Sequence, residues 1–304
     1  AKLNERQMRE LVQAMEDFNL LLKSQLPAKT RAGRKLELYL EKDYDRITRV
    51  SAFRNIGFVG SWPEVSSSFV QYDPADDKLF RHYAVFYTLA SHYTDNSFFR
   101  TSPLWFKTGA PLFFSTTYID EEGAFILGAP DIRRPIQETV NGKKLARTFT
   151  TLAPAKSEKS WSRFYRMSRE ATYPLLVDPV YSGKLEGYLD AVSAGKPVDE
   201  AMEIFGDLDA LGDSIQERLR SGNYSYRRVA LKPRPPIALS IREMRDDEIA
   251  LTEPRFRRLR AKDLEKTSKN LRKLTERFEE SAPVWHEYAA TEFARVRASD
   301  FGEE

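Results

Sequence analysis

The sequence has no cysteine among its 304 residues, which excludes disulfide bonds and thiolate-bound metal ions. It has no apolar run close to the roughly 18 residues that a membrane-spanning helix needs. Its first residues, Ala1 to Asn4, contain no hydrophobic signal region. We therefore expect a protein without a membrane anchor that is not secreted. Its expected location is the cytoplasm, or a virus particle assembled in the cytoplasm.

Residue patterns that support catalysis are scarce as well. The only histidines are His82, His92 and His286. If the first two shared one helix, their ten-residue spacing would turn them about 80° apart, so they would not face one site. The sequence has no His-Glu-x-x-His and no Gly-x-Ser-x-Gly segment. We expect no cofactor and no metal ion, and an enzyme is the less favoured interpretation.

Paired carboxylates leave no signature in a sequence, because they meet only in the folded chain. A carboxylate-dependent hydrolase therefore remains an alternative, with candidate side chains at Asp73, Asp95 and Asp120. A deep pocket containing two of these three would favour it.

Residues 73–128 are the most aromatic and least charged part of the chain, and we expect the rest to pack around them. Asp73 and Pro74 are typical of a helix start, because the carboxylate can accept from free backbone N–H groups and proline has no N–H to leave unpaired. An apolar face at spacings of three and four then predicts a helix. Its members are Leu79, Tyr83, Phe86, Ala90 and Tyr93.

Two hairpins are predicted in the middle third of the chain. Residues 112–127 contain two β-prone runs around a short turn with Gly123. Residues 135–152 contain two more around Asn141 and Gly142, the residue pair that best fits the positive φ angles of a two-residue turn. The predicted fold class is α+β, with helical N- and C-terminal segments around a small, mostly antiparallel sheet with two hairpins.

The ends of the chain are predicted to be helical. Residues 3–24 carry one apolar stripe, and a second helix at 31–54 would complete a helical hairpin. Three regions follow: residues 1–56 as an N-terminal helical hairpin, 57–180 as an aromatic-rich α+β core, and 181–304 as a mostly helical C-terminal region with short strands at 224–241.

The last helix is expected to begin near Pro283, after a charged helix at 255–280. This terminal helix pair could dock a neighbouring subunit or pack on its own domain, and both interpretations stay open. The apolar residues of the last helix lie on one face, at Trp285, Tyr288, Ala289, Phe293 and Val296.

Charge is unevenly distributed, although the formal net charge is only +3. Residues 133–171 and 220–273 are basic, whereas 182–216 are acidic. Such blocks suit a polyanion or a complementary protein surface. Residues 156–171 also fit an amphipathic helix packed on a core, and that alternative stays open. The predicted nucleic-acid contacts are Lys156, Lys159, Arg163, Arg166, Arg169, Arg227, Arg228, Arg257, Arg258 and Arg260.

One short segment resembles a known family. Trp105, followed by the run Ser115 to Asp120 and by Gly123, is similar to a fragment of extracellular CACHE-type sensor domains. The signal and membrane helices expected with such domains are not found in this sequence. No ligand site is carried over from the resemblance.

The scarcity of catalytic patterns, the charge blocks and the amphipathic terminal helices together favour one function. We expect a non-enzymatic structural or assembly protein of a larger complex, such as a virus or phage particle or a nucleoprotein. Its partners would be other protein subunits, in an oligomer or a hetero-complex, with nucleic acid as a further partner. The alternative is a nucleic-acid-binding module of a replication or defence system, whose affinity would fall steeply with salt.

Overall fold

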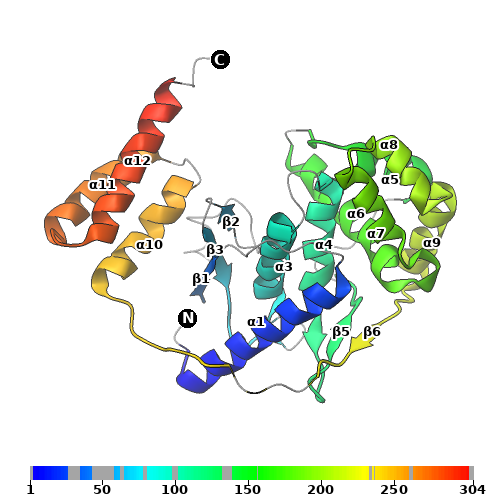
Figure 1. Ribbon diagram of the computed structural model, residues 1–304, viewed down its shortest axis with the longest axis horizontal. Coiled ribbons are helices and arrows are strands. Elements are labelled where there is room, and N and C mark those ends of the chain that lie inside the picture. Colours follow the sequence, from blue (N-terminus) through cyan, green and yellow to red (C-terminus); the bar gives the residue numbers. More distant parts are fainter. Residues whose placement is uncertain are drawn as a thin grey trace.

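The computed structural model describes residues 3–26, 35–42, 58–61, 65–77, 81–97, 102–131, 139–155, 157–232, 235, 237–259 and 263–300. The first half contains α1 (Glu5–Gln25), β1 (Lys35–Glu41), β2 (Phe58–Ser61), β3 (Val65–Gln71), α3 (Tyr83–Ser97), α4 (Leu104–Ser115), β4 (Tyr118–Ile119), β5 (Phe125–Leu127) and α5 (Gly142–Thr150). The second half contains α6 (Glu158–Val177), η1 (Pro179–Tyr181), α7 (Lys184–Ser193), α8 (Val198–Ala201), η2 (Met202–Phe205), α9 (Leu208–Ser221), β6 (Arg227–Val229), α10 (Asp246–Leu259), α11 (Leu264–Arg277) and α12 (Ala282–Asp300). In Figure 1, α10–α12 lie at one end of the molecule and α5–α9 at the other.

Two three-stranded sheets lie between these helical ends (Figure 1). In the first sheet, β1 pairs in parallel with β3, and β2 pairs antiparallel with the other side of β3. In the second, β5 pairs antiparallel with both β4 and β6. The pair β4–β5 is the hairpin predicted around Gly123, although residues 112–115 belong to α4. The α+β class is confirmed, and the first sheet is mixed.

The second predicted hairpin is wrong, because residues 142–150 form α5. Asn141 takes the N-cap position, where its side-chain oxygen accepts a hydrogen bond from the Lys144 backbone N–H at 3.0 Å. A Cβ on Gly142 would lie 2.4 Å from Asp209 Oδ1, so the glycine permits close packing of α5 on α9. The residue pair that predicted a turn therefore starts a helix instead. Residues 135–138 lie outside the described residues.

The second N-terminal helix is also wrong where the structure describes it, since residues 35–41 form β1. Leu36, Leu38 and Leu40 alternate with other residues at the period of a strand. Two of them, Leu38 and Leu40, pack on the main hydrophobic core. This alternation prevails over the sparse helical stripe, so residues 35–41 do not form the second helix of a hairpin with α1. Residues 43–54 lie outside the described residues.

The helix predicted from Asp73 begins later, at Tyr83. Asp73 instead forms a local turn, in which its Oδ1 accepts from the Ala75 backbone N–H at 3.0 Å. Its carboxylate also pairs with Lys42 Nζ at 2.9 Å. The Ala75 hydrogen bond and then the lysine hold the pKa of Asp73 below its usual value. The residue that predicted a helix cap therefore stabilises a turn and an ion pair.

One large hydrophobic core joins α1 to α9. Phe18 of α1 stacks on Phe86 of α3, with ring centroids 3.9 Å apart. Trp105 of α4 is fully buried, and its Nε1 donates to the Tyr188 hydroxyl of α7 at 3.1 Å. The core has members on both sides of residue 181. Residues 73–128, around which the rest of the chain was predicted to pack, supply many of the side chains in this core.

A buried ion network lies within this core. Glu170 of α6 accepts from its neighbour Arg169 and from Arg218 of α9, the latter at 2.7 Å. Burial alone would raise the pKa of Glu170, but the two guanidinium groups outweigh it and the pKa lies below its usual value. Arg218 also lies over the Tyr173 ring, with its guanidinium carbon 3.9 Å from the ring centroid. The network ties α6 to α9.

Candidate protein-binding surface on the C-terminal helices

Helices α10, α11 and α12 form a three-helix unit with its own small core. Leu251, Leu271 and Val284 contribute one buried side chain from each helix. Leu274, Phe278 and Tyr288 pack around them and are partly buried. The unit is therefore held by burial of apolar surface that is separate from the main core.

The same unit encloses a buried ion pair. Arg258 of α10 donates from Nε and Nη2 to the carboxylate of Glu287 in α12, with Nη2 at 3.2 Å. Glu287 is only 1% exposed, and its charge is compensated by Arg258 and by Arg255, whose Nε lies 3.4 Å from Glu287 Oε2. The acidic residue lies on the inward face of α12, between Val284 and Thr291, which are both fully buried. The sequence analysis did not predict this pair. The available signal was an acidic residue, Glu287, on the helix face that also carries Val284 and Thr291.

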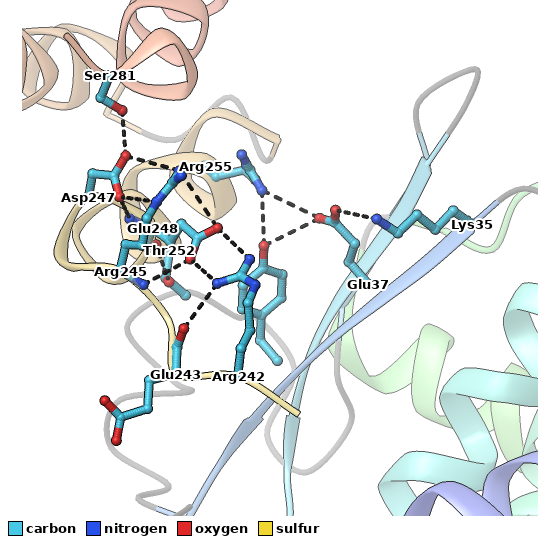
Figure 2. Close-up of polar contacts among 11 residues, drawn as sticks. Lys35, Glu37, Arg242, Glu243, Arg245, Asp247, Glu248, Thr252, Arg255 and Ser281 are labelled. Atoms are coloured by element: carbon cyan, nitrogen blue, oxygen red, sulfur yellow. Dashed lines mark hydrogen bonds and ion pairs between the residues drawn. The ribbon is translucent and has the colours of Figure 1, made fainter. Parts of the chain in front are cut away.

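A second arginine joins the unit to the first sheet (Figure 2). Arg255 Nη1 donates to the Tyr39 hydroxyl of β1 at 2.9 Å and lies 3.4 Å from Glu37 Oε2. Burial raises the pKa of Tyr39, although the nearby guanidinium opposes the rise. The neighbouring residue Phe256 packs against two rings of the sheet, with ring centroids 5.3 Å from Tyr39 and 5.2 Å from Phe69. Polar and aromatic contacts thus attach α10 at one place.

Paired charges secure the start of α10 (Figure 2). Glu248 accepts from both Nη atoms of Arg242 at 2.7 Å and from the Arg245 backbone N–H at 2.9 Å. These contacts, with Arg242 the largest, lower the pKa of Glu248 to about 2. Asp247 accepts from Ser281 Oγ at 2.6 Å, which links the start of α10 to the turn before α12. Acidic residues in a first helical turn also suit the helix dipole.

A groove of about 1150 Å³ separates this unit from α1. Its walls are largely apolar and come from α1, β1, residues 239–244, α10 and α11. Charged side chains of both signs line its edge, among them Glu41, Arg242, Glu253 and Arg257. No two of the carboxylates Asp73, Asp95 and Asp120 line it, so the condition set for a hydrolase is not met here.

The outer face of α12 is apolar. Trp285 is 49% exposed, Phe293 69% and Val296 53%. With Ala289, which is also exposed, they lie within about 80° of one another around the helix axis. We call these four residues the α12 stripe. Tyr288, which we predicted on the same face, instead belongs to the inner side that packs on α10 and α11.

Two of the predicted nucleic-acid contacts lie inside the protein. Arg169 is 3% exposed in its ion pair with Glu170, and Arg258 is 8% exposed in its pair with Glu287. A buried guanidinium whose charge is already paired cannot reach a phosphate at the surface. For these two residues the prediction is corrected.

The other predicted contacts do not form one continuous surface. Lys159, Arg163 and Arg166 lie on α6, of which the first two are exposed. On β6, Arg228 pairs with Asp120 at 2.8 Å and with Glu122 at 2.6 Å, and Arg227 donates to the Leu176 carbonyl at 3.4 Å. Arg257 pairs with Glu253 at 2.7 Å on α10. Lys156 and Arg260 lie outside the described residues. Nucleic-acid binding therefore stays a prediction, carried mainly by α6.

In the part of the chain that the structure describes, no group of three or more His, Asp or Glu side chains could hold a metal ion. None of the described helices is long and apolar enough to cross a membrane.

The histidine His82 is largely enclosed, with its ring 5.0 Å from the Phe86 ring. Its burial, and to a smaller extent the charge of Arg81, lower its pKa to about 4.

The resemblance of residues 105–123 to CACHE-type domains can be compared with the structure. Trp105 is a buried core residue of α4, and Gly123 is the hairpin turn residue at φ 81°. Both are accounted for by packing and turn geometry. No family model matches the chain, and neither a curated protein nor a solved structure matches it.

Proposed function

We propose that the protein is a non-enzymatic assembly protein that binds another protein through the α12 stripe. The observation that carries the proposal is the pair of apolar faces on one helix. The inner face of α12 is already buried on α10 and α11, whereas the outer face leaves Phe293 69% exposed and Trp285 49% exposed. The Trp285 ring contacts Tyr288 of the same helix edge-on, and much of its surface stays open to a partner. Exposed apolar patches of this kind mark protein interaction sites.

The chemistry of the stripe supports the same function. Burying a large apolar side chain contributes about 1.5–3 kcal/mol, and tryptophan is enriched among the residues that dominate interfaces. The Trp285 Nε1 already donates to the Glu279 backbone carbonyl at 2.8 Å. Its only polar group is therefore satisfied, and a partner could cover the ring without leaving a donor unpaired.

The anchoring of the three-helix unit supports a role in assembly. Arg255 and Phe256 attach α10 to the sheet, and the pair of Arg258 and Glu287 holds α12 to α10. A partner bound to α12 would be held at a defined orientation to the main core. A subunit of a larger complex, such as a virus or phage particle or a nucleoprotein, needs such a rigid connection, and cytoplasmic assembly remains part of the proposal.

A photo-crosslinking amino acid at Phe293 tests the proposal in the cells that make the protein. We expect an adduct with another polypeptide after irradiation, because the side chain points into the interface. The matched control carries the same amino acid at Val180, which is 71% exposed on η1, far along the chain from α12. Absence of any adduct at position 293, or equal adducts at both positions, would contradict the proposal.

A second candidate function is nucleic-acid binding, favoured by a small basic cavity between α5 and α6. The cavity has a volume of about 220 Å³ and is lined by Lys144, Arg147 and Arg163, with no carboxylate among its lining residues. Lys159, exposed on α6, adds to the same positive region. Three cations that line one cavity favour the binding of a phosphate group.

Salt dependence tests this second function. Fluorescence anisotropy with single-stranded and duplex oligonucleotides should show affinity that falls linearly with salt concentration on a logarithmic plot. The double change Arg147→Glu and Arg163→Glu should weaken binding and flatten that slope. Arg6→Glu on α1, where the side chain is 84% exposed, is the matched control. Binding that is absent, or insensitive to salt, would reject the candidate.

A further inference from the structure

The α12 stripe is nearly symmetric about its smallest member. Trp285 lies four residues before Ala289, and Phe293 lies four residues after it. In an antiparallel pair of identical helices that cross at Ala289, each Trp285 would therefore meet Phe293 of the other copy. A large ring would oppose a large ring on both sides of the crossing, and a small residue would lie where the two backbones come closest.

The small residue matters because packed helix axes lie about 8–10 Å apart, at the lower end where the contact residues are small. Ala289 is exposed and occupies the middle of the stripe. Two copies could therefore approach until both aromatic residues are covered. Val296 would extend the covered area by one turn toward the end of the helix.

Charges at the two ends of α12 favour the antiparallel arrangement. Glu279 and Glu280 are exposed in the turn before the helix, whereas Arg295 and Arg297 lie in its last turns. An antiparallel crossing at residue 289 places the start of α12, with Glu279 and Glu280 in the turn before it, beside the last turns of α12 in the other copy, where Arg295 and Arg297 lie. A parallel pair would instead bring like charges together at each end, and would also align the two helix dipoles unfavourably.

We infer that the α12 stripe binds a second copy of this chain, through an antiparallel pair of α12 helices centred on Ala289. The inference rests on the proposed function and names the partner of the same surface. The inward face of α12, with Val284 and Glu287, stays as it is in the structure. The dimer therefore needs no rearrangement of the three-helix unit.

Light scattering coupled to size-exclusion chromatography measures the association directly. A single helix pair is smaller than the roughly 1,200–2,000 Å² of a standard interface, so the mass should depend on protein concentration in the micromolar range. At high concentration the mass should approach twice the 35.1 kDa of one chain. Phe293→Glu should weaken dimerisation at least tenfold, and Val180→Glu, at an exposed apolar position elsewhere, should leave it unchanged. Circular dichroism of both variants verifies that they fold.

The absence of cysteine makes the geometry testable by cross-linking. Ala289→Cys should form a disulfide-linked dimer under mild oxidation. Val296→Cys, on the stripe itself, should not, because an antiparallel crossing separates the two introduced thiols by about 21 Å along the axis, whereas a parallel pair would bring them together. Cross-linking at residue 296 as efficient as at residue 289 would overturn the antiparallel arrangement.

A charge exchange adds a second test of direction. Arg297→Glu should weaken the dimer, and adding Glu280→Arg to the same chain should restore it, because the antiparallel crossing brings the start of α12 in one copy beside the end of α12 in the other. Failure of the second change to restore any affinity would count against the inference.

The outcomes separate the two proposals. A chain that stays at 35.1 kDa at all concentrations, or a dimer that Phe293→Glu leaves intact, overturns the inference. The proposed function still stands if the crosslinker at residue 293 captures a different polypeptide, since the adduct mass distinguishes it from a second copy. It fails together with the inference if no adduct forms at residue 293, or if adducts form equally at residues 293 and 180.

Discussion

The Arg255 guanidinium of α10 donates a hydrogen bond to the Tyr39 hydroxyl of β1 at 2.9 Å, across 216 residues of chain. This contact is where the C-terminal helices meet the first sheet. Around it, the Phe256 ring packs edge-on to the Tyr39 ring. The attachment of the proposed binding unit therefore depends on a small number of side chains, and each can be changed singly.

Tyr39→Phe should reduce the free energy of unfolding by about 0.5–1.5 kcal/mol, the usual contribution of one hydrogen bond. The ring contact with Phe256 is kept, and the change removes the hydrogen bond from Arg255 together with the longer one, 3.3 Å, that the hydroxyl donates to Glu37. Urea denaturation measures the loss. Tyr226→Phe is the control, because Tyr226 is 56% exposed. An equal effect of both changes would show that the contact to α10 does not matter for stability.

Glu170→Gln should be far more damaging, with a loss of about 3–5 kcal/mol. The change leaves the buried guanidinium groups of Arg169 and Arg218 without their shared anion. Thermal unfolding followed by circular dichroism measures the effect. Glu217→Gln on the exposed side of α9 is the control, and should change stability by less than about 0.5 kcal/mol. A mild effect at Glu170 would mean that the core can admit water or rearrange around these charges.

Gly212→Ala should destabilise the protein by about 1–3 kcal/mol, because overpacking forces neighbouring backbone to move. A Cβ at this position would lie 2.7 Å from the Asn141 Cα, at the crossing of α5 and α9. Gly187→Ala on α7 is the matched control, since its Cβ would meet only Ile204 Cγ2, at 3.6 Å. Alanine in that helix should be neutral or stabilising. Chemical denaturation of the two variants should therefore shift in opposite directions.

Stability should fall as the pH is lowered from about 6.5 to about 4, in part because of His82. Its pKa lies near 4 in the folded protein, against 6.5 for an ordinary histidine, so the unfolded chain binds more protons in that interval. Below pH 4 both states are protonated and this contribution does not change further. His82→Phe keeps a ring against Phe86 and should flatten the pH dependence. Urea midpoints at several pH values measure it, and a slope in His82→Phe as steep as in the wild type would contradict the prediction.

Local patterns predicted those elements whose own residues define them. Helix α1 has an amphipathic stripe and an Asn4 cap, and α6 starts at the Ser157 cap. The same reasoning failed at Asn141 and Gly142, because Gly142 permits the close packing of α5 on α9 and does not form a turn. It also failed for β1, whose parallel partner β3 begins 30 residues later in the chain, at Val65 opposite Lys35. Such distant pairings leave no local signature.

The candidate surface was predicted only in outline. Periodicity identified the last helix and most of its apolar residues, but it placed Tyr288 and Trp285 on one face. A helix with two apolar sides does not reveal which side the rest of the chain covers. The pairing of Arg258 with Glu287, across 29 residues, decides this in the structure, because it turns the Glu287 side inward. The α12 stripe lies on the side of the helix that stays exposed.

The buried ion pair of Arg258 and Glu287 also fixes the position of α12 along α10. Sliding α12 along α10 by one turn, about 5.4 Å, would strand both charges in an apolar interior. Translation of α12 along its axis, or rotation about it, would therefore cost the free energy of leaving two buried charges unpaired. A partner that binds Trp285 and Phe293 therefore meets them in one fixed position relative to α10, which Arg255 and Phe256 attach to the first sheet. A force applied to the α12 stripe would be transmitted through α10 to that sheet.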